Sequence, residues 1–375
     1  MLSSPPIPAA PFAEDPLYLR TQLITYLGNK RALLPFIGRA VECVRERLGG
    51  RRLAAADLFS GTGVVARFLK QACERLIVND LERYSEITNQ CYLANRDNID
   101  SATLDDALAW LNDRIARCPS PGFITELYAP RDESTITSDD RVFYTRRNAV
   151  YLDTARQAID HLPAELRLFF LGPLLAAASV HANTSGVFKG FYKNANGVGQ
   201  FGGHGRDALS RILRPIAVSR PVLSRFDCAH TVHRADANAL VGQLPFVDLV
   251  YLDPPYNQHP YGSNYFMLNL LADYRRPAAV SRVSGIPTDW NRSRYNQRAE
   301  AEATLFDLID RCPAAFVLIS YNGEGFVPQD HFVEHLQRRG TLTRMEIPYN
   351  TFRGSRNLRG RAIHVTEFLY LLEKR

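Results

Sequence analysis

The tetrapeptide Asp253-Pro254-Pro255-Tyr256 carries the most specific chemical signal in this 375-residue sequence. Two prolines fix φ twice and remove two backbone donors, so the loop presents carbonyl oxygens instead of N–H groups. The Asp253 carboxylate and the Pro254 carbonyl can each accept one hydrogen bond from an amino group. Such a pair favours a tetrahedral nitrogen whose lone pair can attack a methyl group in line, and it helps mainly in the transition state. Tyr256 adds an aromatic face for stacking on a base. An ordinary Pro-Pro turn is the alternative interpretation.

A glycine-rich segment, residues 57–63 (DLFSGTG), has the composition of a ligand-binding turn. Gly61 and Gly63 lack a Cβ, so the backbone can pass close to a ligand. The segment is neither the GxGxxG dinucleotide fingerprint nor a P-loop. Asp80 ends the next predicted strand, about 20 residues further on, and suits hydrogen bonding to ribose hydroxyls. Together these features predict an adenosine-bearing cofactor, whereas a tight turn and a helix N-cap are the structural alternatives.

Asp236 is a third acid that follows a predicted strand, in the sequence HRADAN. Its carboxylate could accept a hydrogen bond from the adenine amino group of a cofactor. A role as a turn residue or helix cap fits the sequence equally well.

Positive charge is concentrated in one segment, residues 181–225. It contains seven Lys or Arg residues and one acid, a local excess of +6 that equals the formal charge of the whole chain. Such a concentration favours nucleic-acid binding more than a global charge does, although a solvated surface is the alternative. Aromatic residues lie between the cations. The DNA-contacting residues predicted from this segment are Lys189, Lys193, Arg206 and Arg211.

Strand-like and helix-like stretches alternate along most of the chain. Strands are predicted at residues 52–59, 75–78, 246–252 and 314–320, and helices at residues 33–48, 64–72, 82–95, 103–115 and 163–181. Residues 118–147 are expected to begin an irregular region, and residues 345–349 and 364–372 to pair as a terminal hairpin. The alternation predicts an α/β fold with a doubly wound, mostly parallel sheet. Its strand ends should place residues 60–63, 79–80 and 253–256 along one edge, where such sheets bind ligands.

Composition argues against several other classes of protein. No stretch of about 18 uninterrupted apolar residues occurs, so no membrane span is predicted. The N-terminus lacks the basic start and apolar run of a signal peptide. The six cysteines are scattered without CxxC or Cys/His clusters, which indicates reduced cytoplasmic thiols and no metal site. We therefore expect a cytoplasmic protein that uses no metal.

The sequence resembles the alpha group of adenine-specific DNA methyltransferases, which includes Dam and the FokI modification methylase. The DPPY and FxGxG elements are the specific part of this resemblance. The matching pieces span most of the chain in that family's order. They are residues 26–30 (YLGNK), 57–63, 79–80, Asp236, 250–257 (VYLDPPYN), 261–265 (YGSNY), 318–322 (LISYN) and 367–372 (EFLYLL).

The resemblance implies a Rossmann-like, S-adenosylmethionine-dependent methyltransferase fold. Residues 1–117 and 226–375 would form the catalytic domain, and residues 118–225 an inserted helical and loop region for target recognition. The implied reaction moves a methyl group from S-adenosylmethionine to the exocyclic amino group of adenine in duplex DNA, by base flipping and direct in-line transfer. A cognate restriction endonuclease is the implied genetic partner.

The resemblance also implies roles for individual residues. Tyr26 and Lys30 would help to hold the cofactor, Phe59 would pack on it, Asp80 would bind its ribose and Asp236 its adenine. The expected cofactor-binding set is Tyr26, Lys30, Asp57, Phe59, Gly61, Gly63, Asp80 and Asp236, and the expected catalytic set is Asp253, Pro254, Pro255 and Tyr256.

Two other functions remain open at this point. Acceptor-rich DPPY or NPPY loops also serve methyltransferases that act on RNA or on a protein amide, although the basic insert favours duplex DNA. A catalytically inactive DNA-binding homologue is the second alternative. The intact Asp253, Tyr256, Gly61 and Gly63 argue against it.

The loop of residues 349–361 generates a prediction of its own, because it carries four arginines, no acid and two glycines. An exposed cationic loop suits a clamp on the DNA backbone, since the guanidinium fork can bind phosphate oxygens in two places. Arg353→Ala and Arg356→Ala should therefore weaken binding to target and scrambled duplexes about equally. Binding of both duplexes at two salt concentrations measures this. A changed target preference without general loss would indicate base readout, and no change would indicate a solvated hairpin tip.

Overall fold

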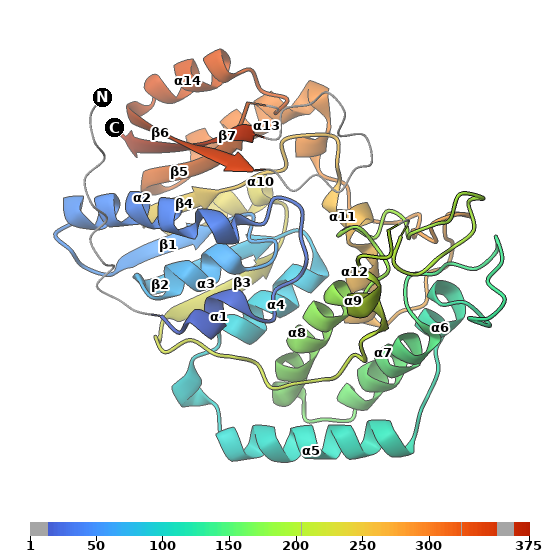
Figure 1. Ribbon diagram of the computed structural model, residues 1–375. Coiled ribbons are helices and arrows are strands. Elements are labelled where there is room, and N and C mark those ends of the chain that lie inside the picture. Colours follow the sequence, from blue (N-terminus) through green and yellow to red (C-terminus); the bar gives the residue numbers. More distant parts are fainter. Residues whose placement is uncertain (1–13, 204, 324, 351–363) are drawn as a thin grey trace.

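The computed structural model describes residues 14–203, 205–323, 325–350 and 364–375 (Figure 1). Within these residues, seven strands form one sheet in the order β3-β2-β1-β4-β5-β7-β6. The strands are β1 (Leu53–Asp57), β2 (Cys73–Asp80), β3 (Ala229–Arg234), β4 (Val247–Leu252), β5 (Ala314–Asn322), β6 (Gly340–Asn350) and β7 (His364–Lys374).

The first five strands across the sheet are parallel, and β7 runs antiparallel between β5 and β6. This confirms the predicted α/β fold with a mostly parallel sheet, and β6 with β7 confirms the terminal hairpin. Asp57 at the end of β1 pairs in register with Val78 on one side and Tyr251 on the other. The ends of β1, β2 and β4 therefore meet at one edge, as the sequence predicted.

Helices cover both faces of the sheet and bury its alternating apolar side chains in two cores. One face packs against α2 (Leu34–Arg47) and α3 (Val64–Lys70), the other against α10 (Ala237–Leu240), α13 (Arg298–Arg311) and α14 (Gln329–Gln337). Strands covered on both faces are nearly continuous in apolar residues, as LAAAD in β1 and VDLVYL in β4 show.

A third core belongs to a group of helices beside the sheet, at the lower right of Figure 1. It consists mainly of α4 (Arg83–Leu93), α5 (Ser101–Arg117), α6 (Phe123–Tyr128), α7 (Arg146–Ile159), α8 (Ala164–Val180) and α12 (Phe266–Asp273). The short elements are α1 (Pro16–Arg20), α9 (Leu209–Leu213), α11 (Tyr261–Asn264) and the 3-10 turns η1 (Lys30–Leu33), η2 (Arg96–Asn98), η3 (Val241–Gln243) and η4 (Arg294–Asn296). Among the described residues, no helix combines the length and the apolar character that a membrane span requires.

The expectation that residues 118–147 begin an irregular region is wrong in part, because α6 lies inside this range and α7 starts at its end. The sequence did not reveal α6 because a distant carboxylate holds its first turn. Asp153 in α7 is fully buried and accepts hydrogen bonds from the backbone N–H groups of Gly122 (2.8 Å) and Thr125 (2.7 Å). It also accepts from the hydroxyls of Thr125 (2.6 Å) and Tyr274 (2.7 Å).

Asp153 therefore provides a test of how the helical group is held together. Asp153→Ala leaves several buried donors without an acceptor and should lower the free energy of unfolding by about 3 kcal/mol. Urea unfolding followed by circular dichroism measures the change. The matched control is Asp106→Ala on the exposed side of α5, which should change the free energy by less than about 0.5 kcal/mol. Equal midpoints for the two variants would contradict the assigned role.

Candidate active site

A pocket that is open to solvent lies at the carboxyl ends of β1, β2 and β4, and the space among its lining residues, open solvent included, is about 890 Å³. Predicted site residues from separate parts of the chain line the pocket together. They are Tyr26, Lys30, Asp57, Phe59, Gly61, Asp80, Asp236, Asp253 and Pro255.

Three of the predicted site residues, Gly63, Pro254 and Tyr256, are not among the residues that line this pocket. Gly63 has φ +75, and a Cβ there would lie 2.7 Å from Asn89 Oδ1. It therefore allows the turn into α3, where neither the conformation nor the space suits a side chain. Tyr256 lies beside the pocket, where its ring meets Tyr321 edge-on at 6.0 Å and its carbonyl accepts from the Phe326 N–H.

A buried lysine joins two carboxylates at the edge of the pocket. Lys30 Nζ lies 3.3 Å from Asp253 Oδ1 and 3.8 Å from Glu367 Oε2. Burial alone would lower the pKa of Lys30, but the two carboxylates more than offset this and the pKa is raised. Burial also raises the pKa of Asp253, to about 6, although the Lys30 charge opposes the change.

Asp57 is fully buried at the end of β1, where the Phe59 N–H and the Ser60 hydroxyl lie near its carboxylate but neither forms a hydrogen bond of good geometry. Burial raises its pKa well above the usual range and the nearby charge of Asp253 raises it further, whereas Phe59 and Ser60 oppose the change. A buried carboxylate with such weak donors is costly, and a cationic or N–H-bearing ligand in the pocket would relieve that cost. The lining is therefore suited to a ligand that carries positive charge.

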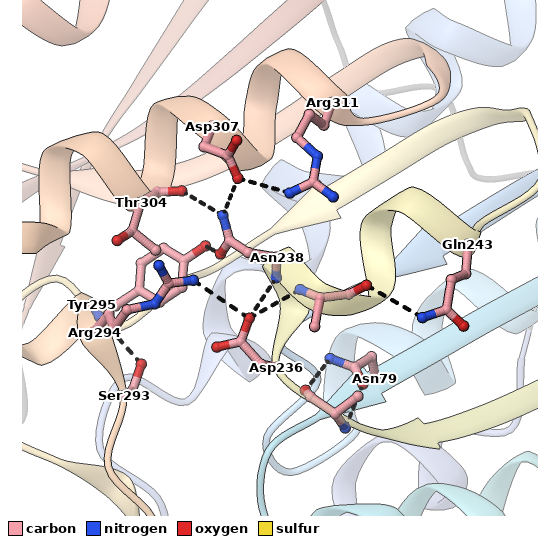
Figure 2. Close-up of polar contacts among 12 residues, drawn as sticks. Asn79, Asp236, Asn238, Gln243, Ser293, Arg294, Tyr295, Thr304, Asp307 and Arg311 are labelled. Atoms are coloured by element: carbon pink, nitrogen blue, oxygen red, sulfur yellow. Dashed lines mark hydrogen bonds and ion pairs between the residues drawn. The ribbon is translucent and has the colours of Figure 1, made fainter.

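Asp80 and Asp236 both form the hydrogen bonds of a turn or a helix cap, which were the structural roles considered as alternatives to ligand binding. Asp80 accepts from the N–H groups of Gly61 (2.7 Å) and Glu82 (2.9 Å), and so ties the glycine turn to the end of β2. Asp236 Oδ1 caps α10 by accepting from the N–H groups of Asn238 (2.9 Å) and Ala239 (3.1 Å). The other oxygen of Asp236 takes no part in the contacts drawn in Figure 2. Both acids still line the pocket, so a cap role and a ligand role are compatible.

Residues 291–296 supply a wall of the pocket that was not predicted from the sequence. Tyr295 is buried, meets the Phe59 ring edge-on at 5.1 Å, and donates its hydroxyl to Asn238 Oδ1 at 2.6 Å (Figure 2). Asn238 in turn donates to the Thr304 carbonyl and to Asp307, which fixes its orientation. Nothing in the local sequence signals this wall, because it depends on contacts with α10 and α13.

Glu82 and Glu367 were also missed. Burial raises the pKa of Glu82 to about 7, although Asn269 and Asn291 donate hydrogen bonds to it. Glu367 could have been found from the predicted hairpin, because an antiparallel last strand starts at the edge where the parallel strands end. Its register partner is Asn322 at the end of β5.

The predicted DNA-contacting residues that the structure describes fall into three groups. Lys189 and Lys193 line an open groove together with Phe191 and Tyr192. Phe188, between the groove residues Val187 and Lys189, donates its N–H to the carbonyl of Asn264 at 2.7 Å, so the groove lies next to α11, the helix that follows the predicted catalytic loop. Arg206 is exposed and has φ +56.

Arg211 also lines the groove, but its guanidinium donates to the carbonyls of Val180, Ala182 (2.9 Å) and Thr184 (3.2 Å). Its donors therefore support the loop, which is not the role that the sequence predicted for it. Arg353 and Arg356 lie outside the described residues. Among the residues that the structure describes, no group of three or more His, Cys, Asp and Glu side chains could hold a metal ion.

Comparison with known proteins gives one family and several relatives. The model of the D12 class N6 adenine-specific DNA methyltransferases matches residues 26–283. The type II methyltransferase M.NlaIII of Neisseria lactamica is 27% identical over 363 residues, which cover 94% of this chain and 99% of that protein. The type II methyltransferase M.CviAII of Paramecium bursaria Chlorella virus 1 is 27% identical over 326 residues, covering 84% of this chain and 89% of that protein.

The type II methyltransferase M.FokI of Planomicrobium okeanokoites is 23% identical over 364 residues, which cover 93% of this chain. This match covers 52% of M.FokI, so the chain spans about half the length of that relative.

The site geometry predicts that Lys30 sets the ionisation of Asp253. In Lys30→Met the ionised carboxylate loses its cation, so the pKa of Asp253 should rise above its value of about 6. Nuclear magnetic resonance of isotope-labelled aspartate carboxyl carbons, with the signal assigned by Asp253→Asn, measures this pKa. The neighbouring exposed Arg31→Met is the control and should leave it unchanged. An equal or lower pKa in Lys30→Met would contradict the assigned electrostatics.

Proposed function

The chain belongs to the D12 class of N6 adenine-specific DNA methyltransferases, and on that basis we propose that it uses S-adenosylmethionine to methylate an adenine flipped out of duplex DNA. The family makes the chain an adenine-specific DNA methyltransferase, and its relatives are type II modification enzymes. The methyl donor, base flipping, in-line transfer and the role of each residue are the proposed part.

The observation that carries the proposal is the Asp57 carboxylate, which is buried in an acid-rich pocket without a hydrogen bond of good geometry. S-adenosylmethionine supplies an electrophilic methyl group on a sulfonium centre, and it also carries an α-ammonium group. Asp57 would accept hydrogen bonds from that ammonium group. Asp80 would bind the ribose hydroxyls, and Asp236 the adenine amino group through the oxygen that does not cap α10. Phe59 and Tyr295 would pack on the adenine, which gives the aromatic wall a function.

Tyr26 and the glycine turn would hold the cofactor from the opposite side. Tyr26 stacks on Tyr265, with ring centroids 4.4 Å apart, and its hydroxyl lies 2.9 Å from that of Tyr84. A Cβ on Gly61, which has φ +52, would approach the Tyr26 ring to 3.1 Å. The close approach of this ring to the turn explains why position 61 needs glycine, and it fixes Tyr26 at the pocket wall.

The chemistry at the target nitrogen would come from Asp253 and Pro254. Each would accept one hydrogen bond from the adenine amino group and leave the nitrogen lone pair aimed at the methyl group. These bonds strengthen as positive charge grows on nitrogen, so they lower the barrier more than they tighten ground-state binding. Lys30 would keep Asp253 ionised at neutral pH. Tyr256, which is only half-buried, would stack on the flipped base.

The DNA would lie across the pocket mouth and the adjoining groove, with Lys189, Lys193 and Arg206 near its phosphates. We retain residues 118–225 as the proposed target-recognition region and propose a cognate restriction endonuclease as genetic partner. RNA or a protein amide as the acceptor, and a catalytically inactive homologue, are outcomes that the next experiment separates.

The test is transfer of labelled methyl groups to duplex DNA, RNA and protein, followed by mass spectrometry of the nucleosides. The wild type should produce N6-methyladenine in DNA. Asp253→Ala should reduce kcat by about a thousandfold or more, because the lost acceptor acts mainly in the transition state. Its affinity for S-adenosylmethionine, measured by calorimetry, should change little.

Asp106→Ala is again the control, since this exposed acid on α5 is not among the pocket residues. Near-normal turnover of Asp253→Ala would refute the proposed mechanism. Label in RNA or protein but not in DNA adenine would refute the proposed substrate, and no transfer by the wild type would indicate an inactive homologue.

A further inference from the structure

The wall of the cofactor pocket also has an outer side, which the sequence analysis did not associate with any function. We call residues 290–298 (WNRSRYNQR) the strap. It contains three arginines and no acid, although Asp289 and Glu300 flank it. Asn291, Ser293, Tyr295 and Asn296 of the strap line the pocket. Its three arginines are exposed, so one short segment presents a cofactor-facing side and a cationic side.

The strap is fixed against the chemically active elements of the protein. Asn291 donates to the Leu81 carbonyl at 3.3 Å and to Glu82 at 3.1 Å, next to the end of β2. Asn296 donates to the carbonyl of Asn257 at 2.7 Å, directly after Tyr256. The outward arginines are therefore held within a few residues of the loop that would receive the target base.

Two of the arginines have no acidic partner among the ion pairs of the described residues. The Arg298 guanidinium lies 4.9 Å from the centre of the Phe326 ring, and the Phe326 N–H donates to the carbonyl of Tyr256. Arg292 lies over the Trp290 ring at 4.3 Å. Arg298 also begins α13, where a cation gains nothing from the helix dipole. Helix stability therefore does not explain the position of Arg298.

Arg294 differs from the other two because its guanidinium lies 3.7 Å from Asp236 (Figure 2). It is thus engaged with the proposed adenine-binding acid and is not one of the phosphate contacts proposed below. A further cation lies near the chain that follows the catalytic loop. Burial lowers the pKa of His259, and the nearby charge of Lys189 lowers it further.

We propose that Arg292 and Arg298 of the strap bind the phosphate backbone of the DNA beside the flipped adenine. The inference rests on the proposed function for the identity of the base, but DNA binding by this surface can be measured separately from methyl transfer. Planar guanidinium groups anchored on aromatic rings keep their N–H edges free for phosphate oxygens. Lys189, whose charge acts on nearby His259, would bind a further phosphate close to the same loop.

The experiment measures the affinity of the full chain for a short duplex over a range of salt concentrations. Neutralising both residues in Arg292→Gln/Arg298→Gln should reduce the slope of log affinity against log salt by about 1.8, because each phosphate contact contributes about 0.9. Arg292→Lys/Arg298→Lys keeps the charges and should retain most of the slope. The double Lys variant therefore distinguishes the effect of lost charge from the effect of lost packing on Trp290 and Phe326.

Arg96→Gln is the matched control. Arg96 is an exposed arginine in η2, and Asn95 beside it accepts a hydrogen bond from the N–H of Cys228, just before β3 begins. Arg96 therefore lies near the amino end of β3, whereas the strap lies near the carboxyl ends of the strands. Replacement of Arg96 should not alter the slope of log affinity against log salt. A slope for the double Gln variant equal to that of Arg96→Gln, or an equal loss of slope in the double Lys variant, would overturn the proposal.

Single methylphosphonate substitutions test where the contact lies. In the wild type, a neutral linkage next to the methylated adenine should weaken binding, and the double Gln variant should lose this penalty. A penalty that persists in the variant would place the contact elsewhere. Methyl transfer by the wild type is measured in parallel. Absence of N6-methyladenine would refute the proposed function, whereas the salt slope would still decide whether the strap binds DNA.

Discussion

The arrangement of the site depends on one buried cation, Lys30, which lies between the carboxylates of Asp253 and Glu367. Parallel strands bring acids to one edge of the sheet, and the antiparallel β7 begins at the same edge. Without a cation, these buried carboxylates would favour their protonated forms, and Asp253 would lose acceptor capacity. Lys30 comes from the short η1 turn before α2, so a segment far away in sequence from the DPPY loop completes the electrostatics of that loop.

The two ends of the pocket differ in whether a cation of the protein balances the buried carboxylates. Near Lys30 the acids are compensated within the protein, whereas Asp57 has no hydrogen bond of good geometry and no cation beside it among the described residues. The pocket thus holds one carboxylate whose charge is balanced and one that needs a ligand. In the proposed function the first accepts from the target amino group and the second from the ammonium group of the methyl donor. The strap then connects these ends, since it contacts Asn238 in α10 and Asn257 after the DPPY loop.

Sequence reasoning could find those features that depend on local composition and strand order. Apolar runs indicated the strands, and the acids at or directly after their ends, Asp57, Asp80 and Asp253, meet at one edge because parallel strands align their carboxyl ends. It could not find α6, whose first turn depends on Asp153 from another helix. It missed Tyr295, which reaches the pocket only through contacts with Asn238 and Phe59. It also placed Arg211 among the residues that contact DNA, although the Arg211 guanidinium donates hydrogen bonds to backbone carbonyls of the protein.

The most direct test of the central claim is a crystal structure with sinefungin, an unreactive analogue in which a carbon atom replaces the sulfonium sulfur and an amine replaces its methyl group. The account predicts that its α-ammonium group lies within hydrogen-bond distance of Asp57, while its adenine contacts Phe59 and Tyr295. The amine that replaces the methyl group should point towards Asp253 and the Pro254 carbonyl. An analogue bound outside this pocket, or bound inside it with its α-ammonium group away from Asp57, would contradict the account.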